Sequence, residues 1–180
     1  PCSFPDRPSM SSTYPSSLPS PGRTGRIAVP PAVTIMAVGV FAAGTSEFMP
    51  SGLLPAIARD FAIDIPHAGL TVSIFAIGMV IGGLLSALAT TRWSQRSLLL
   101  SAIVTLAIGH VIGALASSFE GLLVSRLVSA LATGAFWTIA AVVAVTITPE
   151  GARARALARL VGGMTLANII GVPLLSLIHI

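Results

Sequence analysis

The chain has 180 residues, of which 54% are hydrophobic and 9% are charged, and its formal net charge is +4. Soluble domains carry about 25% charged residues, so this composition indicates a membrane protein. Every basic residue is an arginine, and the absence of lysine excludes a P-loop nucleotide site and a lysine Schiff base on this chain. The arginines are spaced between apolar runs rather than gathered on one surface, which argues against nucleic-acid binding.

The first 28 residues are rich in proline and serine and hold few large apolar side chains. Such a segment cannot bury enough surface to offset its ordering entropy. We therefore expect residues 1–28 to form a disordered tail and residues 29–180 to form a membrane domain.

Five apolar runs follow the tail, and each is long enough for the roughly 20 helical residues that cross a bilayer. A buried core helix could explain one such run, but not a series of them joined by short polar segments. The sequence therefore predicts an all-α, polytopic membrane bundle. The predicted spans are about 31–57, 70–90, 98–116, 122–147 and 160–180.

The joints between the predicted spans indicate an orientation. Arginines precede the first span, lie between the second and third as Arg92 and Arg96, and lie again between the fourth and fifth. The alternate joints hold Arg59 with two aspartates, and then only Glu120. Arginine-rich joints face the cytoplasm, so we expect a cytoplasmic N-terminus.

Small residues recur at a spacing of four along four of the predicted spans. This spacing lets helix backbones approach closely in lipid, so it favours a tightly packed bundle. The pairs are Gly78 and Gly82, Gly109 and Gly113, Ala130 and Gly134, and Ala167 and Gly171.

Two charged residues lie inside the predicted spans. Glu47 is the single charge between Ile27 and Ala58, and Arg126 lies in the fourth span. At 1.5 Å per residue, Glu47 is about 10 Å and Arg126 about 9 Å from the outer ends of their helices. An ionisable group at such depth costs about 2.5–3.5 kcal/mol and usually faces a partner or a cavity. We expect the two side chains to face the interior of the helix bundle. The alternative is that the Arg126 side chain extends to the outer membrane–water interface, while Glu47 is protonated and has only a structural role.

Other polar or aromatic residues in the spans are weaker candidates. Phe136 and Trp137 could line a substrate cavity or simply pack, and His110 is more typical of a hydrogen-bonded packing residue. Asn168, followed by Gly171 and Pro173, indicates a bend or a loosened backbone. No pattern of metal ligands or of a soluble catalytic site is present, so we expect no metal and no cofactor.

Three segments carry a resemblance to a known family: "FAAGTSEFMPSGLLPAIARDF", "SRLVSALATGAFW" and "GARARALARLVGGMTLANIIGVPL". With them, the chain from about Val33 to Leu174 resembles the major facilitator superfamily. The most similar branch is that of the bacterial drug-proton antiporters, which includes arabinose-efflux-like and chloramphenicol-efflux-like proteins.

The resemblance implies roles for several residues. Arg126 with Gly134 resembles the family's fourth-helix motif for proton coupling, and the first and fourth helices line the central cavity, where Phe48, Phe136 and Trp137 would lie. Gly163, Gly171 and Pro173 resemble the fifth-helix antiporter motif, with the proline displaced. The loop motif between the second and third helices keeps its arginines, Arg92 and Arg96, but loses its carboxylate and glycine.

The family has twelve helices in two halves, so the chain is expected to supply the first five and to need the missing second half for activity. The resemblance implies proton-coupled efflux of small molecules by alternating access in a bacterial inner membrane, with lipid, substrate and protons as partners and Glu47 as the coupling site. The residues alone leave two alternative functions open. They are a non-transporting membrane scaffold and an intramembrane enzyme, for which the spans offer one carboxylate, Glu47.

Overall fold

A computed structural model of the chain describes residues 28–171 and 173. These residues form five long helices and three short helical elements, joined by short loops. The elements are α1 (Pro31–Asp60), α2 (Ile65–Ala68), α3 (Leu70–Ala89), α4 (Gln95–Ala114), α5 (Phe119–Thr146), a 3-10 turn (Glu150–Ala152), α6 (Arg153–Leu166) and a π-helix (Ala167–Gly171). The predicted all-α class is confirmed.

Four segments are long and apolar enough to cross a membrane: α1, the α2–α3 segment (Ile65–Ala89), α4 and α5. The fifth predicted span, 160–180, overlaps α6, but its last residues lie outside the described residues, as do residues 1–27 of the predicted disordered tail. The helix α6 begins at Arg153, within the predicted joint. Its first turns are rich in alanine and arginine, which are strong helix formers.

The helix starts follow local chemistry. Pro31 occupies the first turn of α1, where its missing N–H costs no hydrogen bond. The hydroxyl of Ser94 accepts a hydrogen bond from the Ser97 N–H at 3.2 Å, and that of Ser118 accepts one from the Gly121 N–H at 3.1 Å. These N-caps satisfy donors that the first turns of α4 and α5 leave free.

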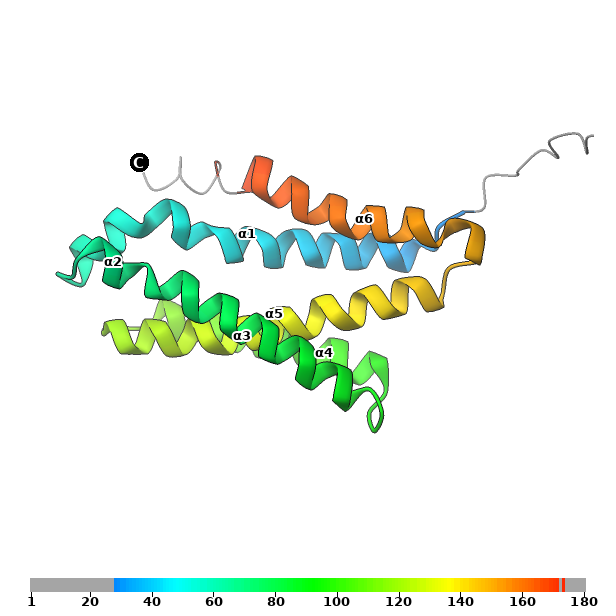
Figure 1. The fold of residues 1–180 in the computed structure, drawn as a ribbon, viewed down its shortest axis with the longest axis horizontal. Coiled ribbons are helices and arrows are strands. Elements are labelled where there is room, and N and C mark those ends of the chain that lie inside the picture. The colour runs from blue at the N-terminus through cyan, green and yellow to red at the C-terminus, as the bar shows by residue number, and fades with distance from the viewer. Residues whose placement is uncertain (1–27, 172, 174–180) are drawn as a thin grey trace, which may run out of the picture.

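The helices pack as two units that lie side by side (Figure 1). In the first, which we call the three-helix group, α3 and α4 both pack along α5. In the second, the α1–α6 pair, these two helices run beside each other. No single helix of the pair contacts a helix of the group as extensively as α1 contacts α6 or as α5 contacts α3 and α4.

Glycines set the close approach of α3 to α5. A Cβ built on Gly82 would collide with the backbone of Leu131, and one on Gly134 would collide with the backbone of Met79. Gly78 in turn faces the Ala130 methyl group. These positions can therefore hold no side chain unless the two helices separate.

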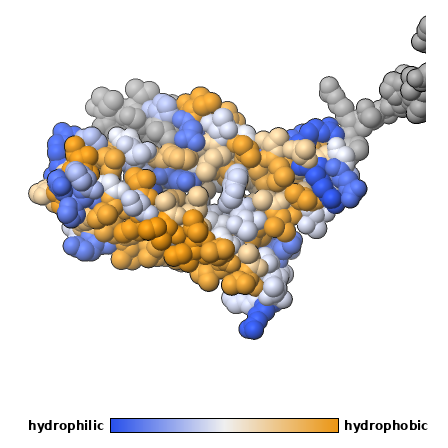
Figure 2. Space-filling view, in the orientation of Figure 1, coloured by the Kyte–Doolittle hydropathy of each residue, from blue (hydrophilic) through white to orange (hydrophobic). Residues whose placement is uncertain are grey.

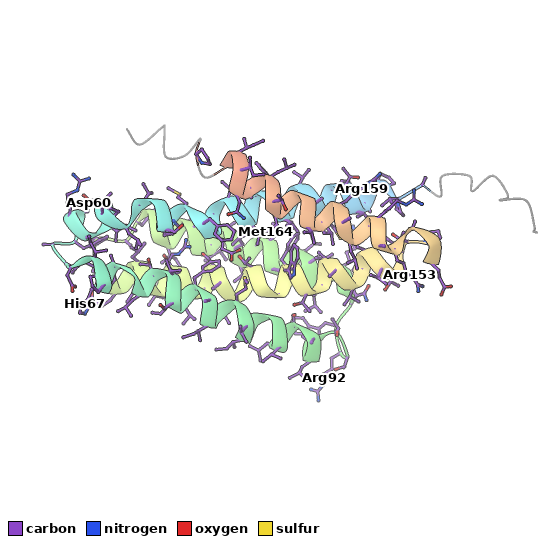
Figure 3. The ribbon with its side chains drawn as sticks, turned by 45° about the horizontal axis from the view of Figure 1, so that its top comes forward. Asp60, His67, Arg92, Arg153, Arg159 and Met164 are labelled. Atoms are coloured by element: carbon purple, nitrogen blue, oxygen red, sulfur yellow. The ribbon has the colours of Figure 1, made fainter. Side chains whose placement is uncertain are left out.

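The outer surface is that of a membrane protein. Large apolar side chains such as Val80, Leu84 and Leu88 are exposed along α3, and apolar residues cover much of the middle of the molecule between more hydrophilic ends (Figure 2). Asp60 and His67 lie at one end, whereas three arginines, Arg92, Arg153 and Arg159, lie toward the other (Figure 3).

Candidate functional site

Arg126 lies on α5 where the three-helix group faces the α1–α6 pair. Its side chain is buried, with 9% relative exposure. The guanidinium carbon lies 4.7 Å from the centre of the Phe75 ring of α3, a distance at which the ring face attracts a cation. The aromatic ring therefore helps to hold a charge away from lipid.

The guanidinium of Arg126 binds the backbone of α1. Its Nη1 and Nη2 atoms both donate to the carbonyl of Ser46 at 3.4 Å, and Nη2 also donates to the carbonyl of Glu47 at 3.3 Å. The two charged residues of the predicted spans thus meet, as their matching depths in the sequence predict.

Pro50 explains why a carbonyl of α1 accepts a hydrogen bond from another helix. Pro50 lies within α1 and is buried. Because proline has no N–H, the carbonyl four residues earlier, that of Ser46, loses its helical partner. In a membrane, a neighbouring side chain must satisfy such a carbonyl, and Arg126 does so.

The carboxyl group of Glu47 makes no comparable bond. Its Oε2 atom is enclosed and has no hydrogen-bond partner among the described residues, and the same is true of Arg126 Nε. Within the described part of the chain, the ion pairs are those of His67 with Asp64 and of Arg153 with Glu150, so Glu47 and Arg126 form none. Arg126 is held by backbone, and the carboxyl of Glu47 stays available for another partner.

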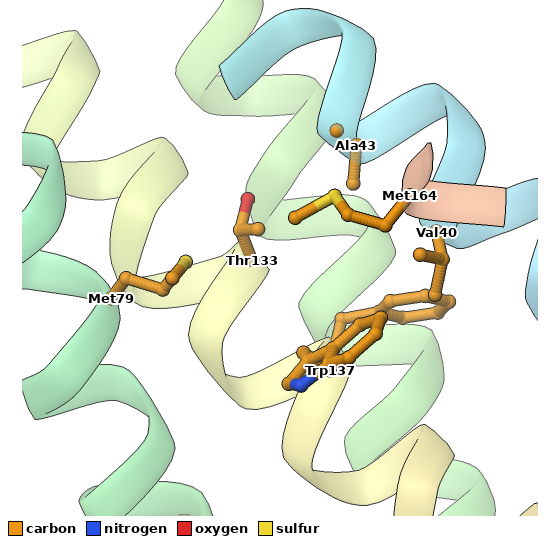
Figure 4. Close-up of a pocket in the computed structure, with 8 residues that line it drawn as sticks. Val40, Ala43, Met79, Thr133, Trp137 and Met164 are labelled. Atoms are coloured by element: carbon orange, nitrogen blue, oxygen red, sulfur yellow. The ribbon is translucent and has the colours of Figure 1, made fainter. Parts of the chain in front are cut away.

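Two cavities lie along the contact between α1 and the three-helix group. The smaller one, of about 50 Å³, lies between the three-helix group and the α1–α6 pair (Figure 4). Its lining residues are Val40, Ala43, Gly44, Met79, Thr133, Phe136, Trp137 and Met164. Phe136 and Trp137 therefore line a cavity, whereas Phe48, which is half-buried, is not among its lining residues. The larger cavity, of about 690 Å³, contains Arg126 and His110 in its wall and reaches Asp60.

The other predicted site residues lie away from the polar centre. Arg92 and Arg96 are exposed in the turn before α4 and in its first turn. A Cβ on Gly163 or Gly171 would collide with Ala37 or Thr45 of α1, so these glycines set the packing of the α1–α6 pair. The π-helix Ala167–Gly171 lies where Asn168 predicts a loosened backbone, and Pro173 is exposed beyond it.

Several residues of the site were not predicted from the sequence. Ser46 and Phe75 hold Arg126, and Met79, Thr133 and Met164 line the smaller cavity. A signal existed for Ser46, because a proline four residues later in a helix always frees a carbonyl.

The described residues contain no group of three potential metal ligands.

A double-mutant cycle tests the role assigned to Pro50. Arg126→Leu leaves the Ser46 carbonyl unsatisfied, which costs about 1–3 kcal/mol. In a Pro50→Ala background the backbone N–H restored at this position can bind that carbonyl, so we expect Arg126→Leu to destabilise the protein by about 1 kcal/mol less. Unfolding in detergent measures both differences. Strictly additive effects would contradict the exchange of partners at Ser46.

The apolar exterior, the membrane-length helices and the buried arginine between them define a multi-pass membrane protein with a polar centre inside its helix bundle. A family model described as "Major Facilitator Superfamily" matches residues 36–179. The chain belongs to the major facilitator superfamily, a family of transporters and not of enzymes, as the resemblance predicts.

Curated relatives agree with this assignment. The chain is 40% identical over 138 residues to the "Inner membrane transport protein YdhP" of Escherichia coli (strain K12), which is 77% of this chain and 36% of the relative. It is 42% identical over 139 residues to a "Chloramphenicol resistance protein" of Streptomyces lividans, again 77% and 36%. The "Putative transporter AraJ" of Escherichia coli (strain K12) is 38% identical over 139 residues, 77% and 35%. The chain thus spans about a third of the length of these relatives.

Proposed function

We propose that these helices belong to a proton-coupled exporter of small molecules that works by alternating access. The observation that carries the proposal is the carboxyl of Glu47, which has an enclosed oxygen without a partner beside a buried guanidinium. A carboxyl group without a hydrogen-bond partner can exchange a proton without breaking a structural bond. Membership of a transporter family and the names of the relatives support the same function.

Arg126 supplies the means by which a proton on Glu47 would change the structure. Its guanidinium binds the backbone of Glu47, so the charge of a deprotonated carboxylate is felt at short range. Protonation removes that attraction. The two states of Glu47 would therefore favour different positions of α1 relative to α5, which is the coupling that an antiporter requires.

The smaller cavity suggests the chemistry of the substrate. Its wall combines aromatic and methionine side chains with one hydroxyl group, that of Thr133, which already donates to the Ser129 carbonyl at 2.9 Å. Methionines adapt to ligands of different shape. We therefore propose a largely apolar or amphipathic substrate, which is consistent with a relative named for chloramphenicol resistance.

We further propose that the segment acts within a longer transporter in a bacterial inner membrane. The matched part is about a third of each relative, and one relative is named as an inner membrane protein. Alternating access needs a second half against which this bundle can move. The arginines at one end of the molecule favour a cytoplasmic location for that end and for the N-terminus.

The proposal is tested in proteoliposomes that contain the longer transporter and a hydrophobic fluorescent substrate. An imposed pH difference of one unit should drive accumulation of about tenfold for one proton exchanged per substrate. A protonophore should abolish that accumulation and leave downhill movement. Accumulation that persists after the pH difference has collapsed would reject proton coupling.

A further inference from the structure

His110 reaches from α4 to the same residue of α1 that Arg126 holds. Its Nε2 atom contacts the hydroxyl of Ser46, and its Nδ1 atom lies 2.7 Å from the carbonyl of Leu106, one turn earlier in α4. The backbone carbonyl of Ser46 binds Arg126. Ser46 therefore connects the imidazole of α4 with the guanidinium of α5.

The two bonds of His110 define its protonation chemistry. A carbonyl can only accept, so Nδ1 carries a hydrogen, and in the neutral ring Nε2 holds a lone pair. The Ser46 hydroxyl then donates to Nε2. When a proton binds Nε2, the hydroxyl can rotate and accept from the new N–H, so the imidazole gains a charge without losing either partner.

The larger cavity gives this imidazole a path to one end of the bundle. Its wall includes His110 and Ala114 of α4 and reaches Asp60 in the last turn of α1. The charged or titratable groups in that wall are Asp60 of α1, His110 of α4 and Arg126 of α5; the contribution of α3 is the uncharged Thr71. His110, itself exposed, thus shares this cavity wall with an exposed acid and a buried cation.

We infer that His110 is a second proton-binding site, which protons reach through the cavity from the Asp60 end. The Ser46 hydroxyl transmits the protonation state of His110 to α1. The inference rests on the proposed proton-coupled function and adds a group to it. A proton from solvent binds the Nε2 lone pair, the ring becomes an imidazolium, and the site gains one positive charge. No other covalent bond is made or broken, and the hydrogen bond between Nε2 and the Ser46 hydroxyl reverses its direction.

The consequence of this charge falls on Arg126. The imidazolium and the guanidinium line one cavity, and they contact the hydroxyl and the carbonyl of the same residue, Ser46. Two positive charges so placed repel each other, so protonation of His110 opposes the hold of Arg126 on α1. In this way a proton arriving from the Asp60 end would loosen α1 beside Glu47. His110 is a positioning residue in this scheme, since it acts through Ser46 rather than on substrate.

The test is a histidine titration by NMR of the full chain, with ¹⁵N-labelled imidazoles, in lipid nanodiscs. The chain has three histidines, His67, His110 and His179, so single glutamine substitutions assign their signals. We expect the Nε2 signal of His110 to change from that of a lone-pair nitrogen to that of an N–H as the pH is lowered. Its midpoint should move by about half a pH unit or more in Ser46→Ala and in Arg126→Gln. His67, which pairs with Asp64 in an exposed position, serves as the control, and its signal should respond to neither substitution.

A His110 ring that stays neutral at every pH at which the protein stays folded, or whose signal responds to neither substitution, would overturn the inference. If His110→Gln loses helical circular dichroism, the His67→Gln and His179→Gln spectra still identify the His110 signal by elimination. The titration needs neither substrate nor gradient. A negative result therefore rejects proton binding at His110 without affecting the proposed role of Glu47. Transport that does not depend on a proton gradient would instead reject the proposed function, without affecting the result of the His110 titration.

Discussion

Replacing Glu47 by glutamine in the longer transporter is expected to abolish uphill transport while downhill transport continues. Glutamine keeps the size of the side chain but cannot exchange a proton, so substrate movement loses its link to the gradient. With a pH difference of one unit, accumulation should fall from about tenfold to about equal concentrations on both sides. Counterflow of labelled substrate, which needs no gradient, should persist and shows that the protein is folded.

Glu120→Gln is the matched control for this experiment. Glu120 lies in the first turn of α5 and is exposed, so its loss removes a carboxylate of the same type from outside the bundle. Accumulation should stay at the wild-type level. If Glu47→Gln accumulates substrate as well as Glu120→Gln does, the carboxyl of Glu47 is not the coupling group, and the alternative of a structural acid stands. A non-transporting scaffold would tolerate both changes.

The largest loss of stability is expected from Gly134→Ala. A Cβ at this position collides with the Met79 carbonyl, lies 2.8 Å from its carbon and lies 3.0 Å from the Gly83 nitrogen. These atoms are all backbone, so α3 and α5 must move apart, which costs about 2–3 kcal/mol. Gly162→Ala is the control, because nothing lies within 4 Å of a Cβ at that position. There, alanine should leave stability unchanged or raise it by up to about 1 kcal/mol through its helix propensity.

Unfolding of both variants by denaturant in the same detergent measures the difference. Because both are glycine-to-alanine changes within helices, the propensity gain is common to the two and the remainder reports the contact between α3 and α5. Equal stabilities for the two variants would mean that this helix contact is not as tight as the glycines indicate.

The fold was largely predictable because the bilayer imposes length and polarity on each span. The four complete apolar runs coincide with α1, α3, α4 and α5 to within a few residues at most ends. The start of α6 at Arg153 was not predicted, since its first turns are polar on one face and read as a joint. A hydropathy pattern predicts only the part of a helix that lies in the hydrocarbon core of the bilayer. It therefore does not predict the start of a helix that begins outside this core.

The depth of the two charged residues along their helices was predictable from the sequence, but their hydrogen-bond partners were not. Counting residues brought Glu47 and Arg126 to one level, and the structure has the guanidinium at the backbone of Glu47. Which atoms meet depends on the rotation of α1 about its axis, which no spacing in the sequence defines. The contact of His110 with Ser46 depends on the same rotation. The glycine pairs, in contrast, predict a contact directly, because a position without a side chain indicates where the backbone of a neighbouring helix can approach closely.

The separation into a three-helix group and an α1–α6 pair has a mechanical consequence. Between the two units, polar contacts gather at Ser46, where Arg126 and His110 both bind, while a small void lies beside Thr133 and Met164. We therefore expect the pair to tilt against the group about Ser46. Spin labels on Val38 and Leu84, both exposed, would report this tilt as a broader distance distribution in Arg126→Leu, and an unchanged distribution would mean a rigid joint.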